Sequence, residues 1–200
     1  MKPAFLLLLS FALPVHADEL LGSILKRLAE PPVIRAQFVQ ERFIADLTRP
    51  TLSRGRITVS RQDGVLWQIE SPVKLALAFT QSGVIETGPD GARRSRGLRR
   101  GAVDMEVGRL MQSIVGADEA SLKASFDAAS EGSLERWTVS LTPRAREMAR
   151  FLKVVRLGGS QHLESIEIEE TSGNSTLIRL RQHAVAEKVA ADELALFKQP

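Results

Sequence analysis

The chain has 200 residues, with 27 Lys and Arg against 24 Asp and Glu, and it contains neither cysteine nor tyrosine. The absence of cysteine excludes disulfides, thiol nucleophiles and a lipid-modified N-terminal cysteine. The absence of tyrosine argues against an aromatic stacking platform for carbohydrate or single-stranded nucleic acid.

The N-terminal segment is typical of a cleaved secretory signal. Met1-Lys2-Pro3 gives a basic start, and twelve mostly apolar residues follow from Ala4 to Val15. Small or apolar residues also stand at the −3 and −1 positions of a cut after Ala17. A bilayer span needs about 20 apolar residues, which makes a membrane anchor the weaker alternative. We therefore predict a signal peptide over residues 1–17 and a periplasmic mature chain over 18–200.

The first part of the mature chain changes from a helical to a strand pattern. Apolar residues recur at helical spacing between residues 20 and 28, so we predict a helix that ends at Pro31-Pro32. Alternating apolar side chains then predict strands over 57–60, 65–70 and 75–79, separated by turns that contain glycine. Such short connections favour an antiparallel meander.

A cluster of basic residues follows these strands. Its five arginines fall within eight positions and could attract phosphate head groups or an acidic partner, a solvated loop being the alternative. The predicted export makes nucleic acid an unsuitable partner. The cluster consists of Arg93, Arg94, Arg96, Arg99 and Arg100.

The remaining chain predicts one more helix and several strands. Helical spacing returns from Val103 to Val115, and Gly116 is a suitable C-cap. Strands are predicted around Phe126 and over 137–141, 151–157, 163–169, 177–180 and 194–197. We predict a single mainly β (α+β) domain, an unclosed, strongly curved antiparallel half-barrel with helices as a lid over the concave face.

The sequence offers no evident constellation for catalysis. His162 and His183 lie in segments without a nucleophile motif, a phosphate-binding loop or a paired-histidine zinc signature. The acidic segment 164–170 is interpreted as a solvated strand. We therefore predict no enzyme, no cofactor and no metal, with an envelope enzyme that uses one of the histidines as the alternative.

Several short motifs occur in a characteristic order along nearly the whole mature chain. They are Phe38-x-Gln40, Ser53-x-Gly55, Ile57 to Arg61, Gly64 to Trp67, Ser71-Pro72, Leu141-Thr142-Pro143 and Glu193 to Phe197. Each motif is short, but in this order they resemble the LolA family of periplasmic lipoprotein carriers.

The resemblance implies both a fold and a cargo. The fold is an unclosed antiparallel barrel with a helical lid, and the cargo is an acylated lipoprotein or lipid. An inner-membrane transporter releases this cargo and an outer-membrane acceptor receives it. Arg61 corresponds by position to an arginine that helps hold the family's lid closed, an exposed strand-end arginine being the alternative. Its guanidinium has five donors, enough to bind several lid carbonyls.

We assign the cavity residues as a hypothesis. The lid helix would contribute Val107, Leu110, Met111 and Ile114, and the sheet would contribute Trp67, Leu77 and Phe79. Methionine suits a variable ligand because its side chain is flexible and polarisable. The sequence thus predicts a monomeric lipid carrier without a cofactor. Two alternatives stay open: a carrier of a glycolipid or polyene lipid, and a non-carrier envelope lipid sensor or regulator of the same fold.

Overall fold

The computed structural model describes residues 17–45, 47–96, 110 and 118–198. The helices are α1 (Ala17–Ala29), α3 (Glu119–Ser125), α4 (Arg146–Ala149) and α5 (Ala191–Phe197). The first six strands are β1 (Val33–Phe43), β2 (Thr51–Ser60), β3 (Gly64–Ser71), β4 (Leu75–Thr80), β5 (Gly83–Thr87) and β6 (Arg93–Arg96). The other five are β7 (Phe126–Ser133), β8 (Arg136–Pro143), β9 (Leu152–Gly159), β10 (Leu163–Glu170) and β11 (Ser175–Ala186).

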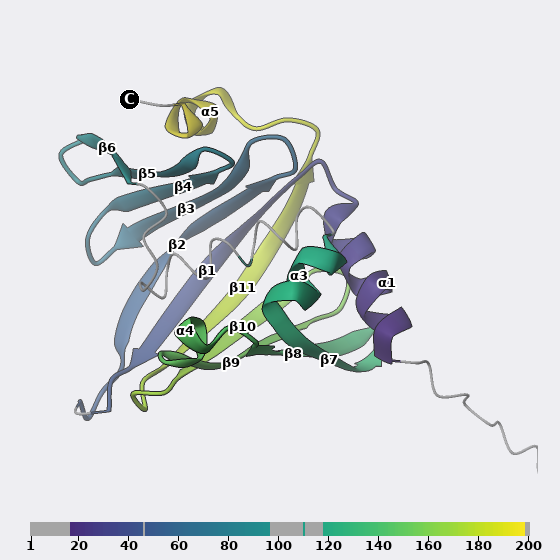
Figure 1. Cartoon of the computed structure of the whole chain (residues 1–200). Coiled ribbons are helices and arrows are strands. Elements are labelled where there is room, and N and C mark those ends of the chain that lie inside the picture. The colour runs from purple at the N-terminus through teal and green to yellow at the C-terminus, as the bar shows by residue number, and fades with distance from the viewer. Residues whose placement is uncertain (1–16, 46, 97–109, 111–117, 199–200) are drawn as a thin grey trace, which may run out of the picture.

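All these strands form one antiparallel sheet in the order β6-β5-β4-β3-β2-β1-β11-β10-β9-β8-β7. The first and last strands of the chain, β1 and β11, are paired at its centre, and β6 and β7 lie at the two ends of this order. Figure 1 shows the strands running side by side in a sheet that curves strongly. This confirms the predicted unclosed, curved antiparallel sheet.

Irregular pairing contributes to the curvature of the sheet. The register between β2 and β3 shifts at Gly55, where an added Cβ would lie 1.8 Å from the main-chain oxygen of Gln68. The register between β1 and β11 shifts between Arg35 and Gln37, opposite Gln182 with its φ of 55°. Bulges of this kind bend a strand and increase its local twist. Glycine is required at position 55 because the two main chains approach too closely for any side chain.

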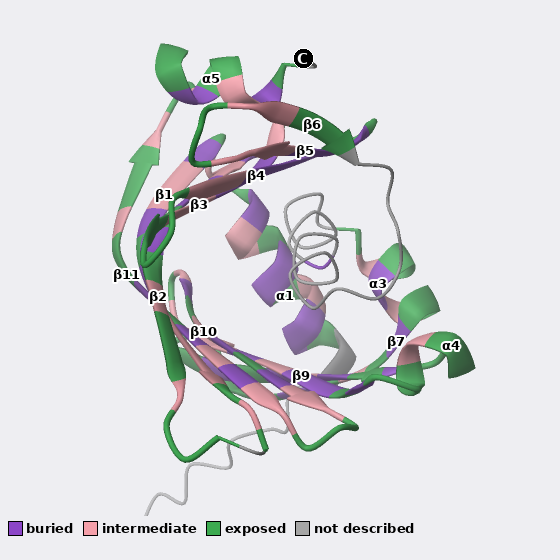
Figure 2. Ribbon diagram, turned by 90° about the vertical axis from the view of Figure 1, so that its left-hand side faces the viewer, coloured by how far each residue is buried: buried purple, intermediate pink, exposed green. Residues whose placement is uncertain are grey.

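Helices cover both faces of the sheet. Figure 2 looks into the curve, with α1 and α3 on the concave side and α5 outside it, above β3, β4 and β5. The apolar stripe predicted for α1 is buried, and it consists of Leu20, Leu21, Ile24 and Leu25. Helical spacing places these side chains on one side of the helix, so α1 can bury them against the sheet.

The strands between β2 and β5 bury both of their faces. On the concave face Ile57, Trp67 and Leu77 lie opposite one another in adjacent strands. On the convex face the neighbouring residues Thr58, Leu66, Ala78 and Ile85 likewise lie opposite one another in adjacent strands. Leu66, Ala78 and Ile85 form a second apolar cluster with Phe197 of α5.

One prediction about secondary structure was wrong, and the alternative of a loop for the arginine cluster does not hold for its first residues. Residues 194–197 belong to helix α5 and not to a last strand, and Arg93–Arg96 form strand β6 and not a loop. The α5 sequence is rich in Ala, Leu and Glu, which favour helix, and the Glu193 carboxylate accepts the N–H of Ala190 at its start. Strand β6 pairs residue by residue with β5, a long-range contact that outweighs its arginine-rich composition.

Candidate functional site

The concave face of the sheet forms the largest apolar surface of the fold. Trp67 lies opposite Leu77, and Phe79 lies opposite Val65, two pairs further along the same two strands and so on the same face. All of them are buried, and the Trp67 ring packs against Phe38 of β1 with ring centroids 4.4 Å apart. The structure therefore brings together the three sheet residues proposed from the sequence, and they form one apolar wall.

Most of the predicted lid lies outside the described residues. Val107, Met111 and Ile114 are among the residues that are not described. Leu110 is described, and it is helical, buried and part of the same apolar cluster as Trp67 and Leu77. The assignment of this segment as a lid stays a prediction.

A small apolar cavity lies between α1 and the centre of the sheet. Its volume is about 50 Å³, which accommodates only a few water-sized molecules. The residues around it come from α1, β1, β2, the β9–β10 turn, β10 and β11, and they are Leu28, Ile34, Arg35, Ala36, Ile57, Val59, His162, Leu163, Leu180 and His183. An acyl chain would fit only if α1 or its side chains moved away from the sheet.

His162 and His183 meet on the wall of this cavity. The rings of His162 and His183 are stacked with centroids 4.9 Å apart. His183 Nε2 lies 2.8 Å from the main-chain oxygen of Leu163, and because a carbonyl only accepts, this nitrogen carries the proton. Burial lowers the pKa of His162, and the nearby His183 lowers it further, while Glu164 opposes both effects. His162 is therefore an uncharged, mainly apolar component of the cavity wall at neutral pH.

Arg61 binds the end of helix α1. Its Nη2 donates to the main-chain oxygens of Ala29 and Glu30, the latter at 2.9 Å. The last carbonyls of a helix lack partners within the helix, and a cation there also interacts favourably with the helix dipole. Arg61 thus connects the end of β2 to the helix that covers the cavity. Its proposed role as a latch for the 103–115 segment stays a prediction.

The arginine cluster does not act as one free group in the described residues. Arg93 is half-buried and donates from Nη2 to the main-chain oxygens of Leu196 and Lys198, so it caps the end of α5. Arg94 is exposed. The Arg96 side chain and all of Arg99 and Arg100 lie outside the described part, so docking through this cluster stays a prediction.

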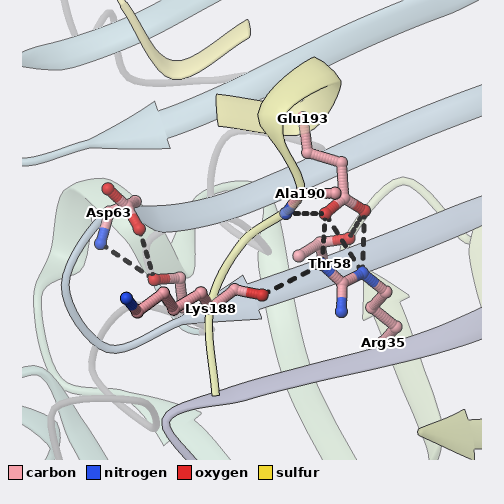
Figure 3. Close-up of polar contacts among 7 residues, drawn as sticks. Arg35, Thr58, Asp63, Lys188, Ala190 and Glu193 are labelled. Carbon is pink, nitrogen blue, oxygen red and sulfur yellow. Dashed lines mark hydrogen bonds and ion pairs between the residues drawn. The ribbon is translucent and has the colours of Figure 1, made fainter. Parts of the chain in front are cut away.

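A buried carboxylate on the convex side was not identified from the sequence. Glu193 of α5 accepts from Arg35 Nη2 at 2.6 Å and from Thr58 Oγ1 at 2.7 Å (Figure 3). Burial raises the pKa of Glu193, but the hydrogen bonds from Arg35, Thr58 and the Ala190 N–H together outweigh burial, and the pKa lies below its ordinary value. This ionised, fully bonded carboxylate fixes α5 to β1 and β2.

A larger but more polar groove opens beside this ion pair. Its volume is about 530 Å³, and charged groups from two segments line it, including Arg61, Asp63, Glu187 and Lys188. Such a lining suits water or a polar partner better than hydrocarbon. The small cavity under α1 is therefore the better candidate for an apolar ligand.

A metal-binding geometry is not found in the described part of the chain. No three acidic, histidine or cysteine residues there lie close enough to hold a metal ion. No described helix has the length and apolar character needed to cross a membrane. The chemistry that the described site supports is the burial of apolar groups.

Comparison with known proteins gives one family and several solved structures with a similar fold. A family model described as "outer membrane lipoprotein carrier protein LolA-like" matches residues 14–197. No curated protein matches the chain. Among solved structures, a LolA superfamily protein from Nitrosomonas europaea is 11% identical with a TM-score of 0.53, over 92% of this chain and 98% of that one. A DUF1329 family protein from Desulfovibrio piger ATCC 29098 is 9% identical with a TM-score of 0.53, over 92% and 99%.

Proposed function

The chain belongs to the outer membrane lipoprotein carrier protein LolA-like family, and on this premise we propose that it is a periplasmic carrier of acyl chains. The cargo would be an acylated lipoprotein, or another lipid, whose hydrocarbon chains enter between α1 and the concave face of the sheet. An inner-membrane transporter would supply the cargo and an outer-membrane acceptor would receive it. The N-terminal segment would direct export, and the carrier would act as a monomer without a cofactor.

One observation supports this proposal most strongly. In the part of the chain that the structure describes, the concave face is apolar from Phe38 to Phe79, and the helix α1, not a second sheet, lies on that side. A helix can move as one body, whereas a closed barrel would have to break main-chain hydrogen bonds to admit a ligand. The small cavity under α1 then corresponds to the empty, closed carrier.

The energetics explain how such a carrier can both bind and release its cargo. Removing a methylene group from water is worth about 0.8 kcal/mol, so a long acyl chain gains much by entering the interior. That gain is offset because the chain displaces protein side chains that were already packed together. The net binding free energy is the difference between burying the acyl chain and burying the protein side chains that it displaces. Loading can therefore be reversible without nucleotide hydrolysis.

The predicted residues have distinct roles in this mechanism. Trp67, Leu77 and Phe79 would contact the cargo from the sheet, and Val107, Leu110, Met111 and Ile114 would contact it from the lid. Arg61 would hold the covering helices in the closed position. The arginine cluster would dock on an acidic partner or on anionic head groups.

The test is native mass spectrometry of the mature protein purified from periplasm, combined with displacement of a fluorescent fatty-acid probe. We expect a co-purified lipid or lipoprotein that is lost from the Leu110→Asp variant. The matched control is Val39→Asp, because Val39 is exposed and is not part of the apolar cluster on the concave face. A clean apo mass, with no probe displaced by any envelope lipid, would contradict the carrier function and favour a sensor or scaffold.

A further inference from the structure

Large apolar side chains are exposed together on one rim of the sheet. Phe43, Leu47 and Leu52 belong to the β1–β2 hairpin and are 43%, 53% and 50% exposed. Val73 in the β3–β4 turn is 60% exposed, and Phe151, just before β9, is 43% exposed. We call these five residues the apolar rim. A group of this size on the surface of a protein usually marks a place where the protein meets a partner or a membrane.

The structure holds the apolar rim in a fixed arrangement. The Ala45 N–H donates to Asn174 Oδ1 at 3.0 Å, and Arg42 bonds Glu170 at 2.9 Å, so the hairpin is attached to the β10–β11 turn. Thr171 in that turn bonds the main-chain oxygen of Phe151 at 3.0 Å. Figure 1 shows the two hairpin tips beside each other at the lower left. Because these bonds already hold the hairpin strands and Phe151 in place, less conformational entropy is lost there on binding.

Basic side chains surround the apolar rim. Arg49, Arg54, Lys74, Arg146 and Arg150 are exposed, and none forms an ion pair with a described residue. The loops that carry the apolar rim and the neighbouring β10–β11 turn have few acidic residues. In the sequence these are Asp46, Glu147 and Glu170, and Glu170 is paired with Arg42. At the opposite rim, by contrast, the turns 61–64 and 133–136 each contain one basic and one acidic residue in the sequence.

We infer that the apolar rim docks on an anionic lipid bilayer. The aromatic and aliphatic side chains enter the boundary between head groups and acyl chains, and the surrounding arginines and lysine face lipid phosphates. A protein partner would be expected to offer a shaped pocket, but a bilayer accepts protruding side chains at several separate loop tips. The surface is distinct from the cavity under α1, so membrane docking and cargo binding can be tested separately.

The experiment uses the absence of cysteine from the chain to introduce single labels. Leu47→Cys and Val185→Cys are each labelled with an environment-sensitive dye and mixed with phosphatidylcholine vesicles that contain phosphatidylglycerol. Val185 is a matched control because it is 56% exposed but lies near the end of β11 away from the rim. We expect a blue shift from the label at position 47 and none from the label at position 185.

Variants then separate the two components of the surface. Phe43→Ser combined with Leu47→Ser should weaken sedimentation with these vesicles by about tenfold or more, since both apolar anchors are lost. Arg49→Gln combined with Arg54→Gln should weaken it by about fivefold per arginine, and only for anionic vesicles. Equal binding to neutral vesicles, or equal shifts from both labels, would refute the inference.

Cargo binding is the control for the fold of these variants. Each rim variant should keep the fatty-acid probe affinity of the unmodified protein. Loss of vesicle binding with normal probe binding identifies the rim as the docking surface. If the unmodified protein binds the probe but no vesicle, the docking inference fails while the carrier proposal stands. If the unmodified protein binds vesicles but not the probe, the docking inference stands while the carrier proposal fails.

Discussion

Helix α1 on the concave face and helix α5 on the convex face are attached to the sheet in different ways. On the concave side, α1 buries an apolar stripe, and its polar bonds to the sheet run from arginine side chains to main-chain carbonyls, as in Arg61 to Ala29 and Arg27 to Leu134. On the convex side, α5 is held by the buried Glu193, which binds both Arg35 and Thr58. Apolar contacts are non-directional and can be replaced by another apolar surface, whereas the bidentate pair at Glu193 has no substitute. We therefore expect an apolar ligand to displace α1 and to leave α5 attached to the sheet.

A matched pair of core substitutions gives the largest expected effect. Ile24 on α1 and Ile85 under α5 are both fully buried. Ile24→Ala and Ile85→Ala should each lower the free energy of unfolding by about 2–4 kcal/mol, as measured by urea denaturation. Only Ile24→Ala should also change the affinity for a fatty-acid probe, because it enlarges the space that the probe would occupy. Equal changes in probe affinity for the two variants would contradict the expectation that only the concave face takes up the probe.

Loss of the carboxylate on α5 should have the next largest effect. Glu193→Ala leaves Arg35 partly buried without its partner, so we expect the free energy of unfolding to fall by about 2–3 kcal/mol. Probe affinity should stay the same. The control is Glu187→Ala, which removes an exposed carboxylate from the same segment. A loss in Glu193→Ala no larger than in this control would show that α5 is held by its apolar contacts alone.

Replacing Arg61 tests the attachment of α1 with a smaller expected loss of stability. Arg61→Ala removes hydrogen bonds from a charged donor to the end of the helix and should cost about 1–2 kcal/mol of stability. Stopped-flow fluorescence should show faster probe entry, because the helix is easier to displace. Arg181→Ala, at an exposed arginine of β11, serves as the comparison. Slower or unchanged probe entry in Arg61→Ala would argue that α1 stays in place during loading.

The smallest effect concerns pH and the histidine pair. The pKa of His162 in the folded protein lies below its ordinary value of 6.5, so below that pH the unfolded chain binds more protons than the folded one. The stability present above pH 6.5 should therefore decrease as the pH falls, and His162→Gln should reduce this dependence. Glu193 titrates below its own ordinary value of 4.5 and does not contribute in this range. Urea midpoints measured from pH 7.5 to 5.5 in both proteins would reveal the difference.

Local patterns in the sequence predicted the helices and strands that can pack against any apolar surface. The stripe of α1 and the alternation around Trp67 and Leu77 need only an apolar surface opposite them, and the structure confirms both. The α5 helix was mistaken for a strand because Leu194 and Leu196 fit a period of two, while Phe197 completes a helical spacing with Leu194. A segment of only 7 residues is too short for periodicity to decide between the two.

Specific long-range pairs could not be predicted in the same way. Arg35 and Glu193 are 158 positions apart, and nothing in either segment shows that they meet. The stacking of His162 on His183 depends on the bulge at Gln182, which places His183 at the cavity, and no turn residue marks this bulge. In both cases the strand register decides the contact, and register is a property of the assembled sheet.

The pairing of β1 with β11 has a consequence for how the chain reaches this fold. The strands β1 to β6 and β7 to β11 are two runs of neighbours that can each form from short-range hairpins, but Val33 pairs with Ala186 across almost the whole chain. Closing such a long loop carries an entropic penalty that slows folding. The pairing of β11 with β1 therefore joins the two halves, and until it forms the concave surface is divided into two incomplete hydrophobic faces.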